Sequence, residues 1–349
     1  MPKHLVAVAP RTTALKNYED REMRSDEVKI QIEYASPKHG TELAAFRGES
    51  PHIADHYDEE WHAFLPREDK AGDPFDGHWV LGNQFVGTIV EAGSDAKGFS
   101  IGERVCGYGG IAETHISSIN DLLKMPESMS WQNAVCYDPA QFALGGVRDG
   151  GVKLGDTVAV IGLGAIGQVA AQFARLAGAS YVAVIDPIEK RRACALAAGA
   201  NAAFDPTAVD AGLELKKATG KRGVDVIIET SASEAALQAA LRGLIFSGTI
   251  AFVGWARPFR SGLDLGREAH FNNANIVFTR AVSTPLREHP RWTFERICQT
   301  CWQILSDGRI DCKDIIDPVI PFANAAGAYE EYVDRHPDRS IKLGFSFEK

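Results

Sequence analysis

The sequence contains little of what marks membrane, secreted or nucleic-acid-binding proteins. Near its start, the apolar run at residues 5–9 is too short for a signal-peptide core and far too short for a membrane span. The formal net charge is -9, so the chain lacks the basic excess that nucleic acid or an anionic membrane surface requires of a partner. We therefore expect a cytoplasmic protein with neither kind of partner.

Cysteine is also scarce. Six cysteines are spread over 349 residues, which argues against a disulfide framework. Only Cys298 and Cys301 form a C-x-x-C pair, and no second such pair accompanies it. The surrounding "ERICQTCWQIL" is typical of an amphipathic helix, so we interpret both residues as small buried side chains, with a metal or redox role as the alternative.

The first 130 residues or so are predicted to be rich in strands. "EVKIQIEYA" alternates apolar and polar residues, as a half-buried strand does, and "NQFVGTIVEAG" ends in a glycine turn. Between them, residues 48–79 have no clear period and are rich in histidine, acids and tryptophan. We expect a long ordered loop or lid there.

From Asp156 onward the pattern changes. The apolar runs "DTVAVIG", "YVAVID", "GVDVIIET" and "TIAFVG" have the length of strands and are separated by helical patterns. This alternation predicts a parallel sheet covered by helices. Two further helices and the strand "SIKLGFSF" follow, and that strand can pair back into the first domain. We therefore predict a β-rich domain at 1–135 and 290–349, and an α/β domain at 136–289.

A glycine fingerprint follows the first strand of the α/β domain. "VAVIGLGAIGQVAAQ" places G-x-G-x-x-G between a strand and a helix, which is the context that dinucleotide binding requires. The three glycines permit a tight turn, close approach of a pyrophosphate, and close packing of helix on strand. The helix N-terminus then attracts the phosphates. The loop residues expected to hold the cofactor are Gly162, Leu163, Gly164, Ala165, Ile166 and Gly167.

Asp186 indicates which dinucleotide to expect. It ends the next strand, at about the distance from Gly162 that the fingerprint requires. A carboxylate there accepts hydrogen bonds from the adenosine ribose hydroxyls and repels a 2′-phosphate, so we predict NAD rather than NADP. Lys190 and Arg191 follow shortly and can soften this preference. Further cofactor contacts are expected at Arg191, Thr230, Val253 and Gly254.

Several segments together resemble the zinc-type alcohol dehydrogenase (medium-chain dehydrogenase/reductase) superfamily. They include "HGTE", "LGNQFVGTIVEAGSDAKGFSIGERV" and "GVKLGDTVAVIGLGAIG". The resemblance implies an α/β protein with a GroES-like β-rich catalytic domain and a doubly wound Rossmann domain with a parallel sheet. Its members pair through the edge of the Rossmann sheet, which implies a homodimer or homotetramer.

A closer resemblance is carried by "SPKHGTE", "AVCYDPAQFALGGVRD" and "LGREAHFNNANIVFTRA". These segments are similar to bacterial sugar dehydrogenases that act on glycosides. The similarity implies that NAD oxidises a secondary hydroxyl, at C3 of a pyranoside, to give a 3-keto-glycoside.

The sequence departs from the superfamily at its zinc ligands. The positions usually held by Cys, His and a third Cys or acid are occupied by His39, Asn83 and Asp138. His39 and Asp138 are potential metal ligands, but Asn83 is a poor ligand for zinc. We therefore expect no catalytic zinc. The structural zinc site is expected to be absent too, because its lobe would need four closely spaced cysteines and only Cys106 is present.

Without zinc, a protein group must accept the hydroxyl proton. His39 has a suitable ordinary pKa, and Asp138 is expected to orient its ring. Asn83 is predicted to hydrogen-bond a substrate hydroxyl, and Thr41, in the proton-relay position of the superfamily, to pass the proton on. Lys38 is the alternative base if burial lowers its pKa. A structural histidine and an acid of a helix or loop are the plainer interpretations of His39 and Asp138.

Candidate sugar-binding residues lie in two polar segments. Trp61 and Trp79, in the predicted lid, can stack on a pyranose ring, and packing tryptophans are the alternative. His270 and Asn273 belong to "REAHFNNANIVF", which is dense in hydrogen-bonding groups; a polar loop before a buried strand is the alternative.

Three other functions remain open from the sequence. One is a zinc-dependent polyol or alcohol dehydrogenase that uses His39, Asp138 and a third ligand. Another is a zinc-free quinone or enoyl reductase, against which Asp186 and the polar lid argue. The third is a protein that binds NAD without catalysing a reaction and tolerates the loss of His39.

Overall fold

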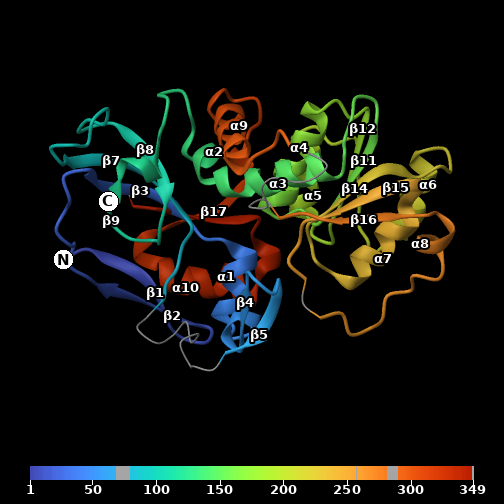
Figure 1. Ribbon diagram of the computed structural model, residues 1–349, viewed down its shortest axis with the longest axis horizontal. Helices are drawn as coiled ribbons and strands as arrows, with labels where there is room; N and C mark the ends of the chain where they lie inside the picture. Colours follow the sequence, from blue (N-terminus) through green and yellow to red (C-terminus); the bar gives the residue numbers. More distant parts are fainter. Residues whose placement is uncertain (68–78, 257, 281–289, 348–349) are drawn as a thin grey trace. The chain divides into compact units, whose positions relative to one another are not determined.

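The computed structural model describes residues 1–67, 79–256, 258–280 and 290–347 (Figure 1). The chain forms two compact units, Met1–Trp131 with Ile316–Lys349, and Gln132–Ile315. The predicted division at 135/136 lies close to the first of these boundaries. The predicted division at 289/290 instead falls inside the second unit.

Helix α9, Phe294–Ser306, explains that difference. It packs on α3, Tyr137–Asp149, where the rings of Tyr137 and Trp302 meet edge to face with centroids 5.5 Å apart. The Asn133 side-chain amide also donates to the carbonyl of Leu305, at 2.9 Å. The periodicity of an amphipathic helix is the same whichever domain it packs on. The sequence pattern alone therefore did not reveal which core the apolar face of α9 would cover.

The first unit is built on two sheets and a separate hairpin. Its main sheet has the order β10-β8-β7-β3-β18-β17, with β9 also paired to β3, and a smaller sheet has the order β2-β1-β6. The strands of the main sheet are β3 Glu27–Ser36, β7 Gln84–Ala92, β8 Arg104–Tyr108, β9 Thr114–Ser118, β10 Leu122–Lys124, β17 Ile316–Pro321 and β18 Lys342–Ser346. Those of the smaller sheet are β1 Lys3–Ala9, β2 Thr12–Asn17 and β6 Trp79–Val80.

The last strand closes the first unit, as predicted. β18 pairs antiparallel with β3 and parallel with β17. Phe345 of β18 packs with Phe85 and Tyr329 in a core whose largest side chains are fully buried. Burial of each such side chain contributes about 1.5–3 kcal/mol. The helical parts of this unit are α1 His39–Phe46, α2 Trp131–Val135 at its boundary, α10 Ala325–Tyr329 and the π-helical stretch Glu330–Arg335.

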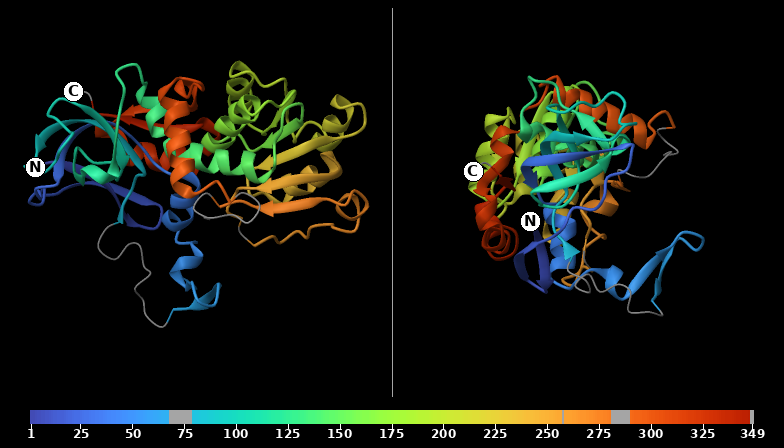
Figure 2. Two further views of the ribbon diagram at one scale, coloured as in Figure 1. Left: turned by 45° about the horizontal axis from the view of Figure 1, so that its top comes forward. Right: turned by 90° about the vertical axis from the view of Figure 1, so that its left-hand side faces the viewer.

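The predicted lid contains regular structure where it is described. Pro51–Ile53 form one turn of 3-10 helix, and β4 Asp55–Asp58 pairs with β5 Ala63–Pro66 as a hairpin. Figure 2 shows this hairpin projecting away from the sheets of its own unit. Residues 68–78 of the predicted lid lie outside the described residues.

The second unit contains the predicted parallel sheet. Its order is β13-β12-β11-β14-β15-β16, and every pairing is parallel. The strands are β11 Thr157–Ile161, β12 Tyr181–Ile185, β13 Ala202–Phe204, β14 Val224–Glu229, β15 Leu244–Phe252 and β16 Asn275–Phe278. The connecting helices are α4 Ala165–Leu176, α5 Glu189–Ala197, α6 Ala211–Ala218, α7 Glu234–Gly243 and α8 Glu268–Phe271. This doubly wound order reverses between β11 and β14, where such folds bind their ligands.

Local sequence accounts for these elements. β11 and β12 are apolar runs that are almost wholly buried, as strands covered on both faces should be. Helices α6 and α9 begin at residues whose side chains accept a backbone N–H, Asp210 from Leu213 and Thr293 from Arg296. The α/β class and the Rossmann sheet are therefore confirmed.

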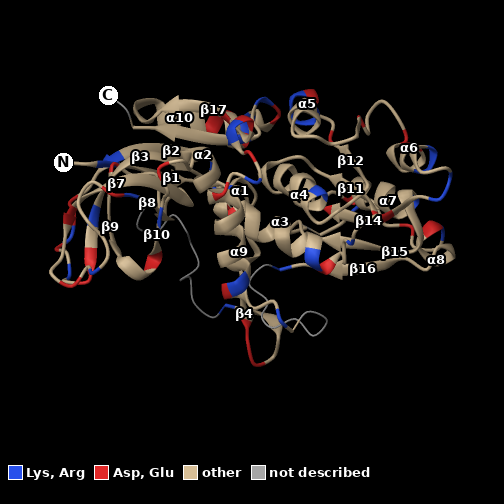
Figure 3. Ribbon diagram, turned by 90° about the horizontal axis from the view of Figure 1, so that it is seen from above, with Lys and Arg blue, Asp and Glu red and all other residues tan. Residues whose placement is uncertain are grey.

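Charges of both signs are interspersed along the ribbons of both units (Figure 3). Within the described part of the chain, no helix combines the length and the apolar character that crossing a bilayer requires.

Candidate active site

The predicted cofactor residues gather at one edge of the parallel sheet. Gly162 follows β11, Asp186 follows β12, Thr230 follows β14, and Val253 follows β15. These strands are parallel, so their carboxyl ends share an edge. Two hydrogen bonds tie the turns together: Val253 N donates to Glu229 O at 2.8 Å, and the Thr230 hydroxyl Oγ1 donates to Gly162 O at 2.7 Å. The edge is therefore already assembled within this unit.

The three glycines of the fingerprint meet the demands expected of them. Gly162 has φ +86°, and a Cβ there would lie 2.7 Å from Ser231 N, so both conformation and space require glycine. A Cβ on Gly167 would lie 1.8 Å from the carbonyl oxygen of Gly162, which shows how closely helix and turn approach. A Cβ on Gly164 would meet open space, so no neighbouring protein atom blocks a ligand from approaching the backbone there. The residues present fit a dinucleotide.

Backbone N–H groups of the glycine loop and of the turn after β12 hold the Asp186 carboxylate in place. Its Oδ2 accepts the N–H of Leu163 at 2.7 Å, and its Oδ1 accepts the N–H of Ile188 at 2.8 Å. Arg191 Nη1 lies 3.9 Å from Oδ2, and Arg192 donates to the Asp186 carbonyl. Each carboxylate oxygen has a second lone pair, but only 4% of the side chain is exposed, so ribose hydroxyls would reach it only after a local shift. Arg192 was not predicted, although it lies beside Arg191 in the same basic run.

Glu229 is a second residue that sequence reasoning missed. It is buried at the end of β14 and accepts the N–H groups of Ser231 at 2.8 Å and Ala232 at 3.0 Å. Burial raises the pKa of this carboxyl, which those hydrogen bonds oppose. Glu229 thereby holds the turn at Ser231, the residue with which a side chain on Gly162 would collide.

In the first unit, β18 holds the segment that carries His39. Ser36 Oγ donates to the carbonyl of Leu343 at 2.7 Å, and Leu343 N donates to His39 Nε2 at 3.0 Å. Lys342 Nζ donates to the carbonyl of Pro37, also at 2.7 Å. Three contacts from the start of one strand thus fix the residues that lead into α1.

The bond from Leu343 specifies the state of the His39 ring. Nε2 accepts an N–H, so it carries no proton, and the neutral ring has its proton on Nδ1. A metal ion or a substrate hydroxyl can use the Nε2 lone pair only by displacing the Leu343 N–H. Leu343 is fully buried, so this displacement would leave its N–H without an acceptor, at a cost of about 1–3 kcal/mol.

Glu42 lies behind this segment and is buried, although it was not predicted to have a role. Its Oε1 accepts the N–H of Gly82 at 2.7 Å and its Oε2 accepts the N–H of Lys38 at 2.9 Å. Tyr329 donates its hydroxyl to Oε2 at 3.4 Å. Burial raises the pKa of Glu42 to about 7, against the opposing effect of these donors and of the Lys342 charge. The only signal in the sequence is an acid at the end of "HGTE".

Asn83 is positioned by its backbone. Its N–H donates to Ser36 O at 3.1 Å, and its carbonyl accepts the N–H of Gly109 at 3.0 Å. Its side-chain nitrogen Nδ2 is buried and has no hydrogen-bond partner among the residues that the structure describes. Such a donor costs about 1–3 kcal/mol unless a ligand supplies an acceptor. This arrangement suits a group that binds a substrate oxygen.

The remaining predicted catalytic residues lie at the start of α1, next to His39, and at the start of α3. Thr41 is exposed on α1, and Lys38 is half-buried at the N-cap of that helix. Asp138 is buried in the first turn of α3, in the second unit, where a carboxylate also interacts favourably with the helix dipole.

The predicted sugar-binding residues have different surroundings. Trp61 is 73% exposed at the tip of the β4–β5 hairpin, whereas Trp79 packs on the core of the first unit. His270 and Asn273 lie on α8 and its exit, before β16 begins. They therefore lie at the amino-terminal edge of the sheet, opposite the cofactor loop, and Asn273 Nδ2 donates to Ser247 Oγ near the start of β15. The structure does not bring these two together with the cofactor residues.

The donor set fits a catalytic zinc poorly. Such a site needs three protein ligands of nitrogen, sulfur or anionic oxygen type. Asn83 supplies an amide in place of one of them, and the Nε2 lone pair of His39 already accepts a backbone N–H. In the described ranges, no three His, Cys, Asp or Glu side chains gather as a metal ion would require.

Comparison with known proteins agrees with this architecture. The alcohol dehydrogenase GroES-like domain matches residues 24–127, and the family described as zinc-binding dehydrogenase matches residues 165–288. The chain belongs to this alcohol dehydrogenase superfamily. It is accordingly an oxidoreductase of the alcohol dehydrogenase type, as predicted.

One relative is similar over the full length. D-guloside 3-dehydrogenase of Escherichia coli (strain K12) is 53% identical over 99% of this chain and 100% of its own. Among solved structures, 2R,3R-butanediol dehydrogenase from Bacillus subtilis has a TM-score of 0.77 at 18% identity and covers 100% of both chains. Galactitol-1-phosphate dehydrogenase from Escherichia coli has a TM-score of 0.76 at 18% identity and covers 99% of both. The last two likenesses support the fold alone.

Proposed function

We propose that this dehydrogenase oxidises a secondary hydroxyl of a glycoside, at C3 of the sugar, with NAD as the hydride acceptor and without catalytic zinc. The observation that carries the proposal is the identity of 53% to D-guloside 3-dehydrogenase over 99% of the chain. The protein base would take the hydroxyl proton and bound NAD would accept the C3–H hydride, so that a 3-keto-glycoside and NADH would be formed.

Bound NAD would supply the electron-pair acceptor, and the carboxyl edge of the parallel sheet would hold it. Gly162, Gly164 and Gly167 shape the phosphate turn, and Asp186 presents its carboxylate at the end of β12. The negative charge repels the 2′-phosphate of NADP. We expect Asp186→Ser to weaken NAD use and to improve NADP use, as measured by kcat/KM for each cofactor. If kcat/KM changed equally with NAD and with NADP, Asp186 would not be the residue that sets the cofactor preference.

His39 is the proposed base. It accepts the hydroxyl proton at Nε2 once the substrate hydroxyl replaces the Leu343 N–H, while the proton on Nδ1 stays in place. Asn83 donates its buried Nδ2 hydrogen to a substrate oxygen. Asp138 orients the charged ring, and Thr41 passes the proton on toward the nicotinamide ribose. Lys38 is the alternative base.

A sugar substrate also suits the exposed hairpin. Trp61 presents an aromatic face at its tip, beside the acids Asp58, Glu59 and Glu60. An aromatic face stacks on the apolar side of a pyranose, and carboxylates accept hydrogen bonds from its hydroxyls. We propose that the hairpin contributes to glycoside binding together with Trp79.

Assembly into a homodimer or homotetramer belongs to the same proposal. β16 is the last strand of the parallel sheet, and Phe278 on it is 78% exposed. An edge strand with apolar side chains is suited to pair with another copy of itself.

The experiment is NADH formation from methyl gulosides, glucosides and galactosides by enzyme treated with a chelator. Turnover without metal, lost by orders of magnitude in His39→Asn while NADH still binds, would support both the substrate class and the base. Turnover that returns only with added zinc would identify a zinc-dependent polyol or alcohol dehydrogenase. Reduction of quinones or enones with NADPH would favour the reductase alternative. NAD binding without any turnover would favour a non-enzymatic protein.

A further inference from the structure

A buried acid and a buried base hold opposite sides of one peptide unit beside His39. Lys342 Nζ donates to the carbonyl oxygen of Pro37 at 2.7 Å. Glu42 Oε2 accepts the N–H of Lys38 at 2.9 Å. These two backbone atoms belong to the same Pro37–Lys38 peptide, so its plane is fixed from both sides.

Both side chains are removed from water. Glu42 is 7% exposed and Lys342 is 3% exposed. A charged or polar group buried to this extent is tolerated only when it is well paired. The Lys342 charge also acts on the Glu42 carboxyl. Replacement of either group therefore removes one of the two contacts that hold the Pro37–Lys38 peptide.

The second oxygen of Glu42 extends the arrangement to Asn83. Oε1 accepts the N–H of Gly82, whose φ of +132° and lack of space for a Cβ, 2.5 Å from Ile111 N, both require glycine. Asn83 is the next residue along the chain. One carboxyl thus fixes the distance between the segment that carries His39 and the segment that carries Asn83.

We propose that Glu42 and Lys342 are positioning residues, which clamp the Pro37–Lys38 peptide and so hold His39 and Asn83 at the separation that the reaction needs. This inference rests on the proposed function, because it takes His39 and Asn83 as the groups that meet the substrate hydroxyl. Neither clamp residue touches substrate in this scheme. Their effect is exerted through the backbone.

The expected consequence is a loss of turnover more than of substrate affinity. In Glu42→Gln the amide keeps one oxygen, so one of the two backbone N–H groups at Lys38 and Gly82 loses its acceptor. A displacement of about 1 Å costs on the order of 100-fold in rate. We expect kcat to fall about 10–100-fold, and KM for the glycoside and the affinity for NADH to change by less than about threefold.

The test combines kinetics with hydrogen exchange of the whole protein. Glu42→Gln, Lys342→Met and the double variant are compared for kcat, KM and NADH affinity, and for deuterium uptake of peptides covering residues 37–46 and 79–85. Glu27→Gln is the control, because Glu27 is a carboxyl of the same unit with a low exposed fraction and contacts neither segment. If Glu42→Gln fails to fold, Lys342→Met carries the comparison.

Faster exchange confined to those two peptides, together with the fall in kcat, would support the clamp, as would a double variant less impaired than the sum of the single ones. The clamp is overturned if Glu27→Gln accelerates exchange there equally, or if Glu42→Gln keeps wild-type turnover. If wild-type enzyme oxidises no glycoside, the proposed function fails, and the exchange data still decide on the clamp by themselves.

Discussion

Two glutamates of the first unit are both buried, yet their carboxyls have opposite properties. Glu27 at the start of β3 is 1% exposed, and the side chain of Arg21 and the backbone N–H of Arg24 lower its pKa to about 2. Glu42 on α1 is 7% exposed, and burial raises its pKa to about 7. Glu27 is covered by the exposed side chains of Arg21 and Arg24, whereas Glu42 is enclosed, so a low exposed fraction alone does not set the charge of a carboxyl.

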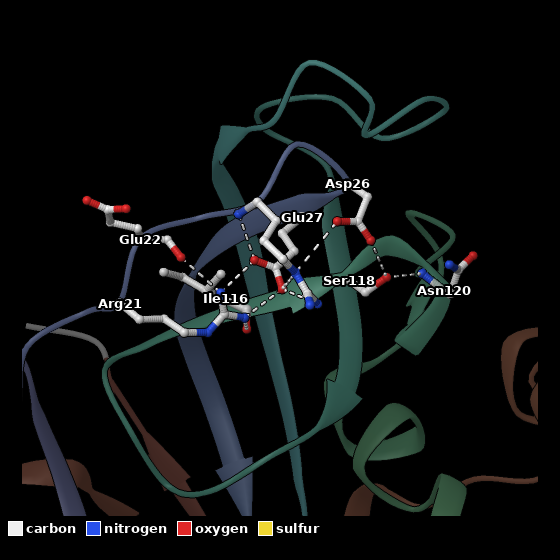
Figure 4. A network of polar contacts seen from close by, with 8 residues as sticks. Arg21, Glu22, Asp26, Glu27, Ile116, Ser118 and Asn120 are labelled. Atoms are coloured by element: carbon white, nitrogen blue, oxygen red, sulfur yellow. Dashed lines mark hydrogen bonds and ion pairs between the residues drawn. The ribbon is translucent and has the colours of Figure 1, made fainter.

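The partners account for the difference. Arg21 points its guanidinium at Glu27 (Figure 4) and donates to both oxygens at 2.6 Å, so the ionised form is strongly favoured. Glu42 receives backbone N–H groups and a tyrosine hydroxyl, which compensate less of the desolvation. A paired carboxyl far below its ordinary pKa is typical of a structural ion pair. A carboxyl whose pKa is raised toward 7 is more typical of a functional site.

The largest expected effect is the pH dependence that Glu42 adds to stability. Its pKa is raised from 4.5 to about 7 on folding, so its stabilising contribution is complete below pH 4.5 and is lost as pH rises through 7. Between pH 4.5 and pH 7, the free energy of unfolding of the wild-type protein should fall by about 3 kcal/mol relative to that of Glu42→Gln. Unfolding in denaturant at several pH values measures the difference. A constant difference would mean that folding does not raise the pKa of Glu42.

Glu27 should show the opposite dependence. Its pKa is lowered on folding, so its stabilising contribution is complete above pH 4.5 and is lost as pH falls through 2. The advantage of wild type over Glu27→Gln should therefore shrink on acidification, whereas the advantage over Glu42→Gln grows. Thermal unfolding of the three proteins between pH 2 and pH 7 tests this. If the melting temperatures of the two variants followed pH in parallel, the pKa values of Glu27 and Glu42 would not be shifted in opposite directions.

The smallest expected effect is that of salt. The Arg21 side chain is 54% exposed and that of Arg24 is 69% exposed, so added NaCl screens their attraction for Glu27. The advantage of wild type over Glu27→Gln should decrease slightly in high salt, while the difference from Glu42→Gln stays unchanged because Glu42 is enclosed. Melting temperatures of all three proteins at low and high NaCl, at one pH, provide the measurement. Equal salt sensitivity would indicate that water reaches Glu42.

Patterns that are local in the chain predicted the parallel sheet and the cofactor edge. The alternating strands and helices and the glycine fingerprint predicted the parallel sheet, because strand burial and the turn at Gly162 depend on residues that are close in sequence. The same local argument misled at His270 and Asn273. Their polarity was read correctly, but α8 precedes β16, so they lie at the edge away from the cofactor loop.

The sequence by itself determined the two kinds of domain and the dinucleotide turn, since these depend on short-range periodicity or on backbone conformations that only glycine adopts. Tertiary structure alone decided the surroundings of His39. Leu343 bonds its ring and Lys342 bonds the Pro37 carbonyl, across about three hundred residues of chain. Contacts at such separation depend on how β18 pairs with β3, and no local pattern encodes which side chains that pairing brings together.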